Sequence, residues 1–309
     1  MEFKDVCNEF ISKLTPRLLG FLDRTTKPDS STAGCFDRYY WHYKLHDIAN
    51  SRFQEAAFLL FYLYNSCKYS EYHKNSKIFE WLQNSVFYWQ SIMNSDGSFN
   101  EVYPFERSFC ATSFSASVIT DVLLKDSNVK FNLFKLIKTG DWLSKNCNHH
   151  IANQKAASVL ALYNISILTG KKKFENSADE RLWELIQEFR NKKFFPEYGG
   201  FDIGYQTITL SVLTDCYIKN KNEELKKVIE DCLSILNSKI ADNGKYNYLE
   251  TSRQTQYLYP YSFSVFHQEL LNKTLNGIKL NQIITPFWLD DRYCIGLLND
   301  YIKIAAAAE

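Results

Sequence analysis

Glycine and proline are scarce in this chain, with 11 glycines and 6 prolines among 309 residues. So few turn-forming residues argue against an all-β protein, which needs many tight turns. Basic and acidic residues nearly balance, and the formal net charge of +1 gives no electrostatic case for binding nucleic acid or an anionic membrane. We therefore expect a helical protein with no nucleic-acid partner.

Long apolar runs are absent as well. The longest candidate, "AAFLLFYLY" (56–64), is far too short to span a bilayer, which takes about 20 residues. The first residues, "MEFKDVCNEFISKL", carry acidic side chains early and lack the apolar segment of a signal peptide. The eight cysteines are scattered without a CxxC pair, which is typical of reduced thiols rather than a disulfide scaffold. These features predict a cytoplasmic protein with no membrane span.

Motifs for several kinds of chemistry are also missing. There is no HExxH, no EF-hand loop and no GxSxG elbow, and Gly199-Gly200 lacks the following lysine of a phosphate loop. His149 and His150 are adjacent, so on a helix they would point about 100° apart and could not easily share an ion. We expect neither a metal nor another cofactor.

Aromatic residues, by contrast, are plentiful, with 23 Phe, 20 Tyr and 6 Trp. Many lie in polar segments that recur roughly every 45–60 residues, the length of two helices with their loops. These segments are 35–44, 95–108, 146–150, 195–205, 242–257 and 286–294.

Two kinds of helix are predicted between the polar segments. Helices with little charge on any side, which should be surrounded by protein, follow the segments at 48–66, 110–124, 151–168, 205–218 and 255–271. Amphipathic helices, with one buried face, precede them at 77–93, 131–145, 178–192 and 222–238. Ser177, with Glu180 three residues later, is the expected N-cap of the third amphipathic helix.

This alternation predicts an all-α protein, and more specifically an α/α toroid of five to six helical hairpins, with an inner ring of helices inside an outer ring. We expect one toroid domain over residues 1–304 and a tail at 305–309 outside it. The alternative is an open helical solenoid built from the same repeats.

The polar segments should gather at one end of such a ring, because each joins an outer helix to the next inner one. Aromatic faces beside carboxylates, amides and arginines suit a carbohydrate, whose C–H faces stack on rings while its hydroxyls need donors and acceptors. Any single member of the set, such as Arg52 with Glu55, could instead be scaffold. The predicted substrate-binding residues are Arg38, Tyr40, Lys44, Asp47, Arg52, Glu101, Arg107, Asn153, Gln154, Glu197, Tyr198, Asp202, Glu250, Arg253 and Tyr257.

One part of the chain resembles a known family. The stretch "NHHIANQKAASVLALYNISILTG", then "LWELIQEF" and "FFPEYGGFDIGYQTITLSVL", all within 148–213, is similar to the α-toroid domain of the heparinase II/III-type polysaccharide lyases. The resemblance places the family's catalytic Asn, His and Tyr on Asn148, His149 and Tyr205. It implies β-elimination at a uronic acid, with Asn148 and His149 stabilising the enolate and Tyr205 moving the proton.

Two departures from the family shape the expected function. The lyases carry a β-sandwich domain after the toroid and are generally exported, and we expect neither feature here. We therefore predict a uronate-containing saccharide as substrate, handled by lyase-like or epimerase-like C5 proton abstraction in surface-polysaccharide biosynthesis, in association with other glycan-biosynthesis proteins.

Other functions stay open from the sequence. One is a glycoside hydrolase using two carboxylates from Glu101, Glu197, Asp202 and Glu250. Another is a non-catalytic toroid that binds a glycan or a protein. The acidic "WLDD" (288–291) also weakly resembles the motif of terpene cyclases, a role that would require a deep apolar cavity.

Overall fold

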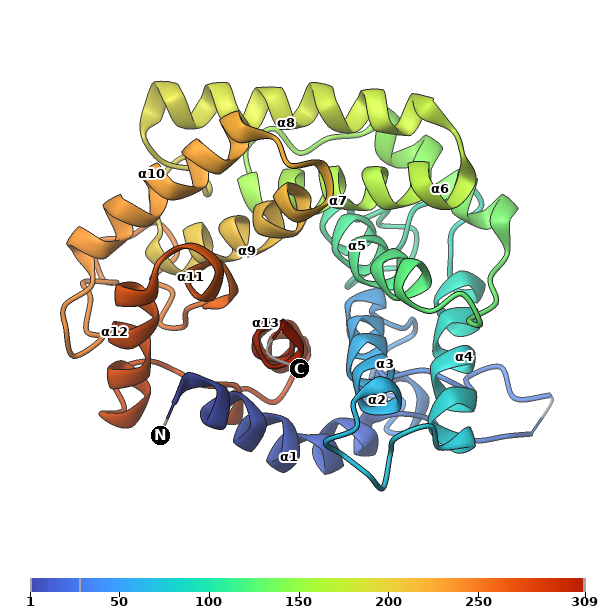
Figure 1. The fold of residues 1–309 in the computed structure, drawn as a ribbon. Helices are drawn as coiled ribbons and strands as arrows, with labels where there is room; N and C mark the ends of the chain where they lie inside the picture. The colour runs from blue at the N-terminus through green and yellow to red at the C-terminus, as the bar shows by residue number, and fades with distance from the viewer. Residues whose placement is uncertain (1, 28, 308–309) are drawn as a thin grey trace. The chain divides into compact units, whose positions relative to one another are not determined.

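The computed structural model of the chain describes residues 2–27 and 29–307, and this part of the chain is all-α, as predicted (Figure 1). No β-strand forms within it, and the only β pairing described is in isolated bridges such as Phe99–Ser108. No helix of the described residues is long and apolar enough to cross a membrane. Where the sequence predicts one domain, the contacts of the described residues divide them into two compact units.

Unit 1 consists of the described parts of Met1–Phe10, Asn148–Leu160 and Ser177–Ala308. Within it, α9 packs against α10 and α11, and α11 packs against α12 and α13 (Figure 1). Its complete helices are α9 (Ile203–Asn220), α10 (Glu223–Lys239), α11 (Tyr261–Phe266), α12 (Gln268–Lys279), the 3-10 helix η2 (Pro286–Trp288) and α13 (Arg292–Ala307).

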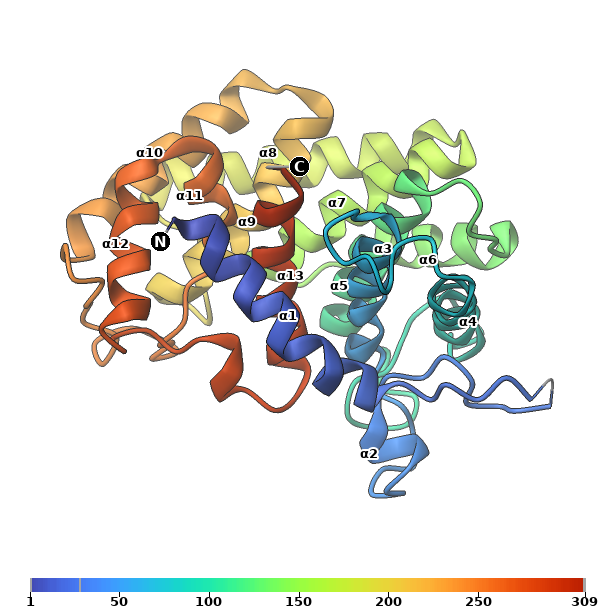
Figure 2. The ribbon, with the colours of Figure 1, turned by 60° about the horizontal axis from the view of Figure 1, so that its bottom comes forward.

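Unit 2 consists of Ile11–Cys147 and Ala161–Asn176. Within it, α3 packs against α4 and α5, and α5 packs against α6 and η1 (Figure 2). Its complete helices are α2 (Arg38–Trp41), the 3-10 helix η1 (Ser51–Ala56), α3 (Ala57–Asn65), α4 (Ser76–Ser91), α5 (Phe109–Lys125) and α6 (Leu133–Lys145). Three further helices contribute residues to both units: α1 (Phe3–Phe21), α7 (Ala152–Thr169) and α8 (Lys172–Lys192).

The predicted alternation of two kinds of helix is present in the structure. In α9, 12 of the 18 residues are buried, whereas in the following α10 only 6 of the 17 are. The same contrast separates α5, with 11 of its 17 residues buried, from α6, with 4 of 13. A helix buried on most sides needs small or apolar residues all round, and an amphipathic one needs a single apolar face. The closure of these hairpins into a ring stays a prediction from the sequence.

Many hydroxyl groups inside the buried helices are satisfied by the backbone of the preceding turn. Ser115 Oγ donates to the Ala111 carbonyl at 2.6 Å and accepts from the indole nitrogen of Trp89 on α4 at 2.9 Å. A buried polar group without such a partner would be costly. These bonds allow α5 to be rich in serine and threonine and still lie in the core.

Polar residues of the predicted segments begin the buried helices. Ser108 accepts from the Ala111 amide at the start of α5, and Asp202 accepts from the Tyr205 amide at the start of α9. A short polar side chain at this position satisfies backbone donors that have no partner within the helix. The segments therefore do precede the buried helices, as the sequence predicts.

Several predicted boundaries were wrong. Helix α8 begins at Lys172, five residues before the expected N-cap Ser177. The helix expected over 255–271 is divided, because α11 ends at Phe266 and His267, with an extended backbone, caps α12. At the end of the chain, α13 continues to Ala307 with Ala305 fully buried, within the tail expected at 305–309; residues 308 and 309 lie outside the described residues.

Candidate functional site

The first turn of α9 organises a polar cluster in unit 1. Asp202 caps the helix through Oδ1, which accepts from the Tyr205 amide at 3.0 Å. Its Oδ2 accepts from the Thr251 hydroxyl at 2.8 Å and from the amides of Arg253 and Thr255 at 3.1 and 3.2 Å. Both oxygens of this fully buried carboxylate are therefore engaged, Oδ1 in capping α9 and Oδ2 in holding segment 251–255 against it.

Gly204 allows that segment to approach closely. A Cβ at this position would lie 2.3 Å from the Thr255 methyl carbon and 2.7 Å from the Tyr257 carbonyl oxygen, so no side chain fits. The absence of a side chain brings the backbone of 255–257 against the first turn of α9. As a result, Arg253 and Tyr257 lie beside Tyr205.

A tight turn presents Tyr198 on the other side of Arg253. The amide of Glu197 donates to the Gly200 carbonyl at 2.9 Å, and the amide of Gly200 donates back at 3.1 Å. Between them, Tyr198 and Gly199 have φ angles of 52° and 81°. The left-handed region costs a residue with a Cβ roughly 1–2 kcal/mol, yet the position holds an aromatic ring that is 56% exposed.

Arg253 lies against two tyrosine rings. Its guanidinium carbon is 4.3 Å from the ring centroid of Tyr198 and 5.8 Å from that of Tyr205. The guanidinium also interacts electrostatically with the Tyr205 hydroxyl. Arg253 is exposed and forms no ion pair with a carboxylate among the residues that the structure describes. Its charge is therefore available to an anionic ligand.

Tyr205 is a half-buried phenol that keeps its proton. Burial raises its pKa, and the nearby Tyr293 raises it further, against the opposing effect of Arg253. Tyr257 continues this cluster, with its ring centroid 6.2 Å from that of Tyr293, and burial raises its pKa as well. In the ligand-free protein Tyr205 is thus a proton donor rather than a base.

Glu197 is a fully buried carboxyl group at the base of the turn. Asn153, near the start of α7, donates to its Oε1 through both the backbone amide (3.1 Å) and the side-chain amide (2.5 Å). Its Oε2 has no hydrogen-bond partner among the described residues. Burial raises the pKa of Glu197 to about 8, an effect that Asn153 and Arg253 oppose and Asp202 strengthens. The group is therefore mostly protonated at neutral pH.

Asn148 and His149 precede α7, at a helix entrance as the sequence predicts. Asn148 donates to Gln154 Oε1 at 3.1 Å and accepts from the His150 amide, so it shapes this loop. Gln154 itself is buried.

His149 is exposed and lies beside the amphipathic helix α8. Its Nδ1 is 3.9 Å from Glu184 Oε2, the same oxygen that lies 3.3 Å from the ammonium of the buried Lys155. The contacts described for His149 thus lead to α8, whereas those of Tyr205 lead to Arg253, Tyr293 and Glu197. The catalytic role of Asn148 and His149 stays a prediction. Of the other unit 1 candidates, Glu250 is exposed to solvent.

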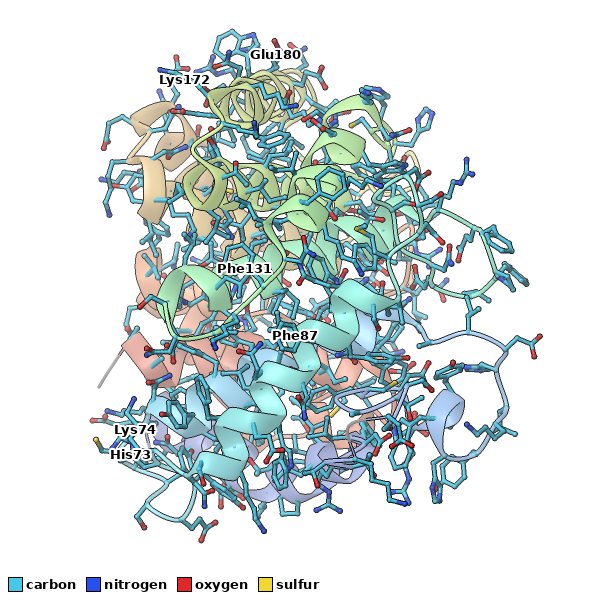
Figure 3. The ribbon with its side chains drawn as sticks, turned by 90° about the vertical axis from the view of Figure 1, so that its right-hand side faces the viewer. His73, Lys74, Phe87, Phe131, Lys172 and Glu180 are labelled. Carbon is cyan, nitrogen blue, oxygen red and sulfur yellow. The ribbon has the colours of Figure 1, made fainter. Side chains whose placement is uncertain are left out.

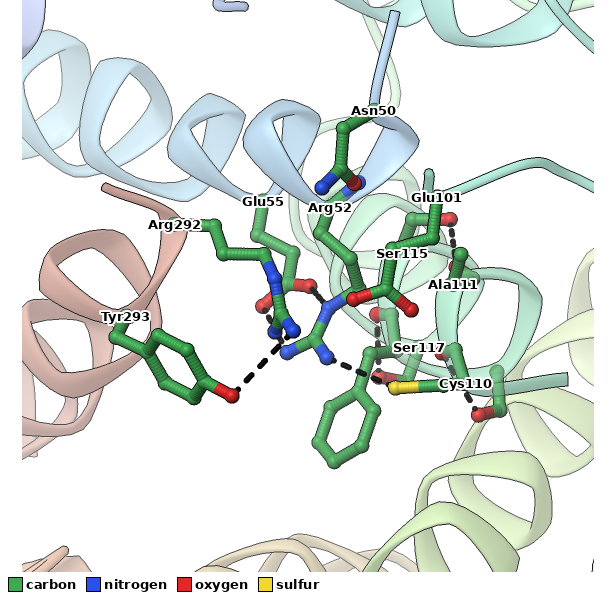
Figure 4. Close-up of polar contacts among 12 residues, drawn as sticks. Asn50, Arg52, Glu55, Glu101, Cys110, Ala111, Ser115, Ser117, Arg292 and Tyr293 are labelled. Carbon is green, nitrogen blue, oxygen red and sulfur yellow. Dashed lines mark hydrogen bonds and ion pairs between the residues drawn. The ribbon is translucent and has the colours of Figure 1, made fainter. Parts of the chain in front are cut away.

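Arg52, in unit 2, is fully engaged by its neighbours (Figure 4). Its Nε and Nη2 donate to the two carboxylate oxygens of Glu55, and its Nη1 lies 3.1 Å from Cys110 Sγ. The guanidinium also lies over the Phe114 ring, 4.1 Å from the centroid. Burial alone would lower the pKa of Arg52, but Glu55 and Cys110 hold it above its ordinary value. These contacts are those of a scaffold pair.

Three of the other unit 2 candidates have partners elsewhere in unit 2. Arg38 donates to the Gly20 carbonyl at 3.1 Å, and Arg107 pairs with Asp96 at 3.3 Å. Glu101 accepts from the Ser108 hydroxyl at 3.3 Å.

The remaining three candidates lie together near α2. Tyr40 packs against the small cluster of Cys35, Ala49 and Tyr88. Lys44 and Asp47 are exposed, and the Lys44 ammonium lies 5.7 Å from the Tyr40 ring centroid. The structure thus places most of the candidates after residue 196 in one cluster around Tyr205 and Arg253. The candidates of unit 2 are distributed over several places.

A separate cavity of about 390 Å³ lies in unit 2 beside α4, where Phe87 projects outward (Figure 3). Hydroxyl groups dominate its lining, and none of the sequence-predicted residues is part of it. The lining residues are Thr25, Thr26, Lys27, Ser30, Ser31, Ala33, Glu80, Asn84, Phe87, Tyr88 and Ser91.

Tyr293 is the member of the cluster that sequence reasoning missed. It lies in the polar segment 286–294 but is not among the predicted substrate-binding residues. Its signal was its place at the start of a helix, in the first turn of α13. The raised pKa of Glu197 was also not predicted from the sequence, because it depends on burial and on the surroundings that include Asn153, 44 positions away.

No cluster of three or more His, Cys, Asp or Glu side chains within 2–27 and 29–307 is arranged to hold a metal ion. No family model matches the chain, and neither a curated protein nor a solved structure shows significant similarity to it. The resemblance to the heparinase II/III-type lyases therefore stays a prediction from the residues quoted for it. The cluster around Tyr205 and Arg253 is therefore the basis of the function proposed below.

Proposed function

We propose that unit 1 binds a uronate-containing saccharide at Arg253, Tyr198 and Tyr205, and that the protein is an enzyme that moves a proton at C5 of the uronate. The observation that carries this proposal is the guanidinium of Arg253, exposed, held against two tyrosine rings and without a carboxylate partner among the described residues. A guanidinium binds a carboxylate through two parallel hydrogen bonds. Exposed aromatic rings offer the faces on which sugars stack.

The chemistry follows from neutralising the carboxylate. When Arg253 binds it, negative charge that develops on the carboxylate as the C5 proton leaves is stabilised. In the first step Tyr205 gives its own proton to solvent, a loss that the nearby charge of Arg253 favours, and its oxygen takes the C5 proton. Delivery of that proton to the departing glycosidic oxygen gives elimination, whereas reprotonation of C5 by water from the opposite face gives epimerisation. Asn148 and His149 enter the proposal as further groups on the carboxylate, as the resemblance implies.

Glycoside hydrolysis is the second candidate, and Glu197 is the observation in its favour. A carboxyl group with a pKa of about 8 is protonated at neutral pH, as a general acid must be. Hydrolysis also needs a second carboxylate about 5–10 Å away. Asp202 is a poor choice, because its two oxygens accept four hydrogen bonds that hold α9 and segment 251–255. The proton-transfer proposal requires no second carboxylate.

The cellular setting belongs to the proposal as well. All eight cysteines are free thiols, which is typical of a reducing compartment. We place the protein in the cytoplasm, acting in surface-polysaccharide biosynthesis beside other glycan-biosynthesis proteins.

The test is a panel of uronate-containing oligosaccharides incubated with the purified protein. Ultraviolet absorbance reports unsaturated uronate, and incorporation of solvent deuterium at C5 reports proton exchange. Tyr205→Phe and Arg253→Gln should abolish both signals. Tyr217→Phe, on the same helix, and Arg190→Gln, on α8, are matched controls that should keep them.

Each outcome points to one function. An ultraviolet absorbance signal that disappears in both site variants establishes a lyase. Deuterium incorporation at C5 without that absorbance establishes an epimerase. Binding of a saccharide with neither absorbance nor deuterium incorporation would overturn the proton-transfer proposal. A hydrolase or a glycan-binding module would then remain.

A further inference from the structure

Unit 1 places a buried carboxyl group close to an exposed guanidinium without joining them in an ion pair. Glu197 is fully buried, and its Oε2 has no hydrogen-bond partner within the described residues. Arg253, on the exposed side of the same turn, is near enough to influence it electrostatically. A carboxylate buried with one oxygen unsatisfied is unfavourable, whereas the protonated group carries no charge to desolvate.

We infer that Glu197 couples the binding of a carboxylate ligand at Arg253 to the uptake of a proton. The inference rests on the proposed function and deepens it, since it names a carboxylate-bearing sugar as ligand and proton concentration as its regulator. With Glu197 protonated, the charge of Arg253 is left to the ligand. With Glu197 ionised, the protein supplies its own anion beside Arg253, and the ligand must compete with it.

Among the groups that face Glu197, we expect Glu197 itself to be the one that changes its protonation state near pH 8. From α9, Asp202 is a carboxylate held by four hydrogen bonds, and Tyr205 is a phenol that keeps its proton. From α7, Asn153 contributes only an uncharged amide, and the ammonium of Lys155 pairs with Glu184 and Glu188 of α8.

Segment 241–260 contributes Arg253 to the same surroundings. Burial raises the pKa of Glu197 to about 8 even with that cation nearby. An anionic ligand that neutralises Arg253 offsets a nearby cation that favours the ionised carboxylate. Ligand binding and protonation of Glu197 therefore favour each other, as linkage requires.

The experiment is calorimetric titration of the intact protein with D-glucuronate at pH 6.5 and pH 8.5, each in two buffers of different ionisation enthalpy. The difference between buffers counts the protons taken up on binding. We expect uptake of most of one proton at pH 8.5 and almost none at pH 6.5. Above pH 8 the affinity should fall by up to about tenfold per pH unit.

Two variants assign the proton. Glu197→Gln keeps a hydrogen-bonding side chain that cannot ionise, so it should bind D-glucuronate with no proton uptake and no pH dependence between 6.5 and 8.5. Glu230→Gln, at an exposed position of α10, is the matched control and should behave as the wild type.

The outcomes separate this inference from the function on which it rests. Absence of D-glucuronate binding at both pH values overturns the proposed function, and this inference falls with it. Binding without proton uptake at pH 8.5 overturns the inference alone. Uptake that persists in Glu197→Gln assigns the proton to another group and overturns it too. The number of protons that the wild-type protein takes up on binding tests the inference even if Glu197→Gln does not fold.

Discussion

Asn153 donates two hydrogen bonds to one oxygen of Glu197, at 3.1 Å from its backbone amide and 2.5 Å from its side chain, and the other oxygen of that carboxyl has no partner among the described residues. This one-sided arrangement fixes the orientation of the group. It also leaves Oε2 to carry the proton, because an acceptor that already receives two donors is the less favourable site for it. The pairing joins the start of α7 to the turn before α9.

The first prediction concerns stability and pH. Glu197 has a pKa of about 8 in the folded protein against an ordinary value of 4.5, so the folded state holds a proton that the unfolded chain has lost. The stability it contributes is complete below pH 4.5 and is lost as the pH rises through 8. Between pH 6.5 and 9, the free energy of unfolding should fall by about 2 kcal/mol more in the wild type than in Glu197→Gln.

Urea unfolding at these two pH values measures this difference. The window lies above the titration of Asp300, another buried carboxyl group of unit 1, whose pKa burial raises to about 6. Equal pH dependence in the two proteins would show that Glu197 is already ionised in the folded state.

The second prediction concerns Tyr198, whose left-handed backbone suits asparagine better than tyrosine. Tyr198→Asn relieves roughly 1–2 kcal/mol of backbone strain and loses a cation–π contact worth about 0.5–1 kcal/mol at an exposed site. We expect the melting temperature to stay the same or rise slightly while D-glucuronate affinity falls severalfold, because Arg253 loses its ring. Tyr198→Phe keeps the ring and should keep the affinity. A loss of affinity in both variants would indicate that the hydroxyl, not the ring, is what matters.

The kinds of helix were predictable from the sequence because burial on all sides and burial on one face leave different patterns of charge. The start of α9 was expected at Tyr205, whereas the helix begins at Ile203, directly after its capping residue Asp202. By contrast, nothing near Glu197 in the sequence indicates that Asn153 will bond to it, since that contact requires the loop before α7 to pair with the turn before α9. Long-range contacts of this kind decide which candidates become a site.

The start of α8 shows that long-range contacts also limit the prediction of helix boundaries from the local sequence. Ser177 is a reasonable N-cap by its local sequence, but the helix continues upstream to Lys172. Phe174 lies in that added turn and is fully buried against Gly140 of α6. Packing of one aromatic ring against another helix thus overrides the local capping signal.

The third prediction treats Arg52 as scaffold rather than as a substrate-binding residue. Replacing it with methionine removes the cation that donates to both carboxylate oxygens of the buried Glu55, and breaking such a pair costs about 3–5 kcal/mol. The double variant Arg52→Met/Glu55→Gln should recover much of this loss, since no charge is then left buried. Arg107→Met, which removes an exposed partner of Asp96, should cost less than about 1 kcal/mol. Chemical denaturation of the four proteins tests the set, and a small effect of Arg52→Met would contradict the scaffold role.

The last prediction compares two glycines in helices of unit 2. A Cβ on Gly140 would lie 2.8 Å from two ring carbons of Phe174 and 3.0 Å from Ile165 Cγ2, whereas one on Gly20 would meet only Arg38 Nη1 at 3.7 Å. Alanine is favoured over glycine in a helix by about 1 kcal/mol, so Gly20→Ala should stabilise the protein. Gly140→Ala forces the Phe174 ring to move, and overpacking of this kind costs about 1–3 kcal/mol. Thermal unfolding should therefore shift in opposite directions for the two variants, and a rise for both would mean that α6 and the first turn of α8 are not closely packed.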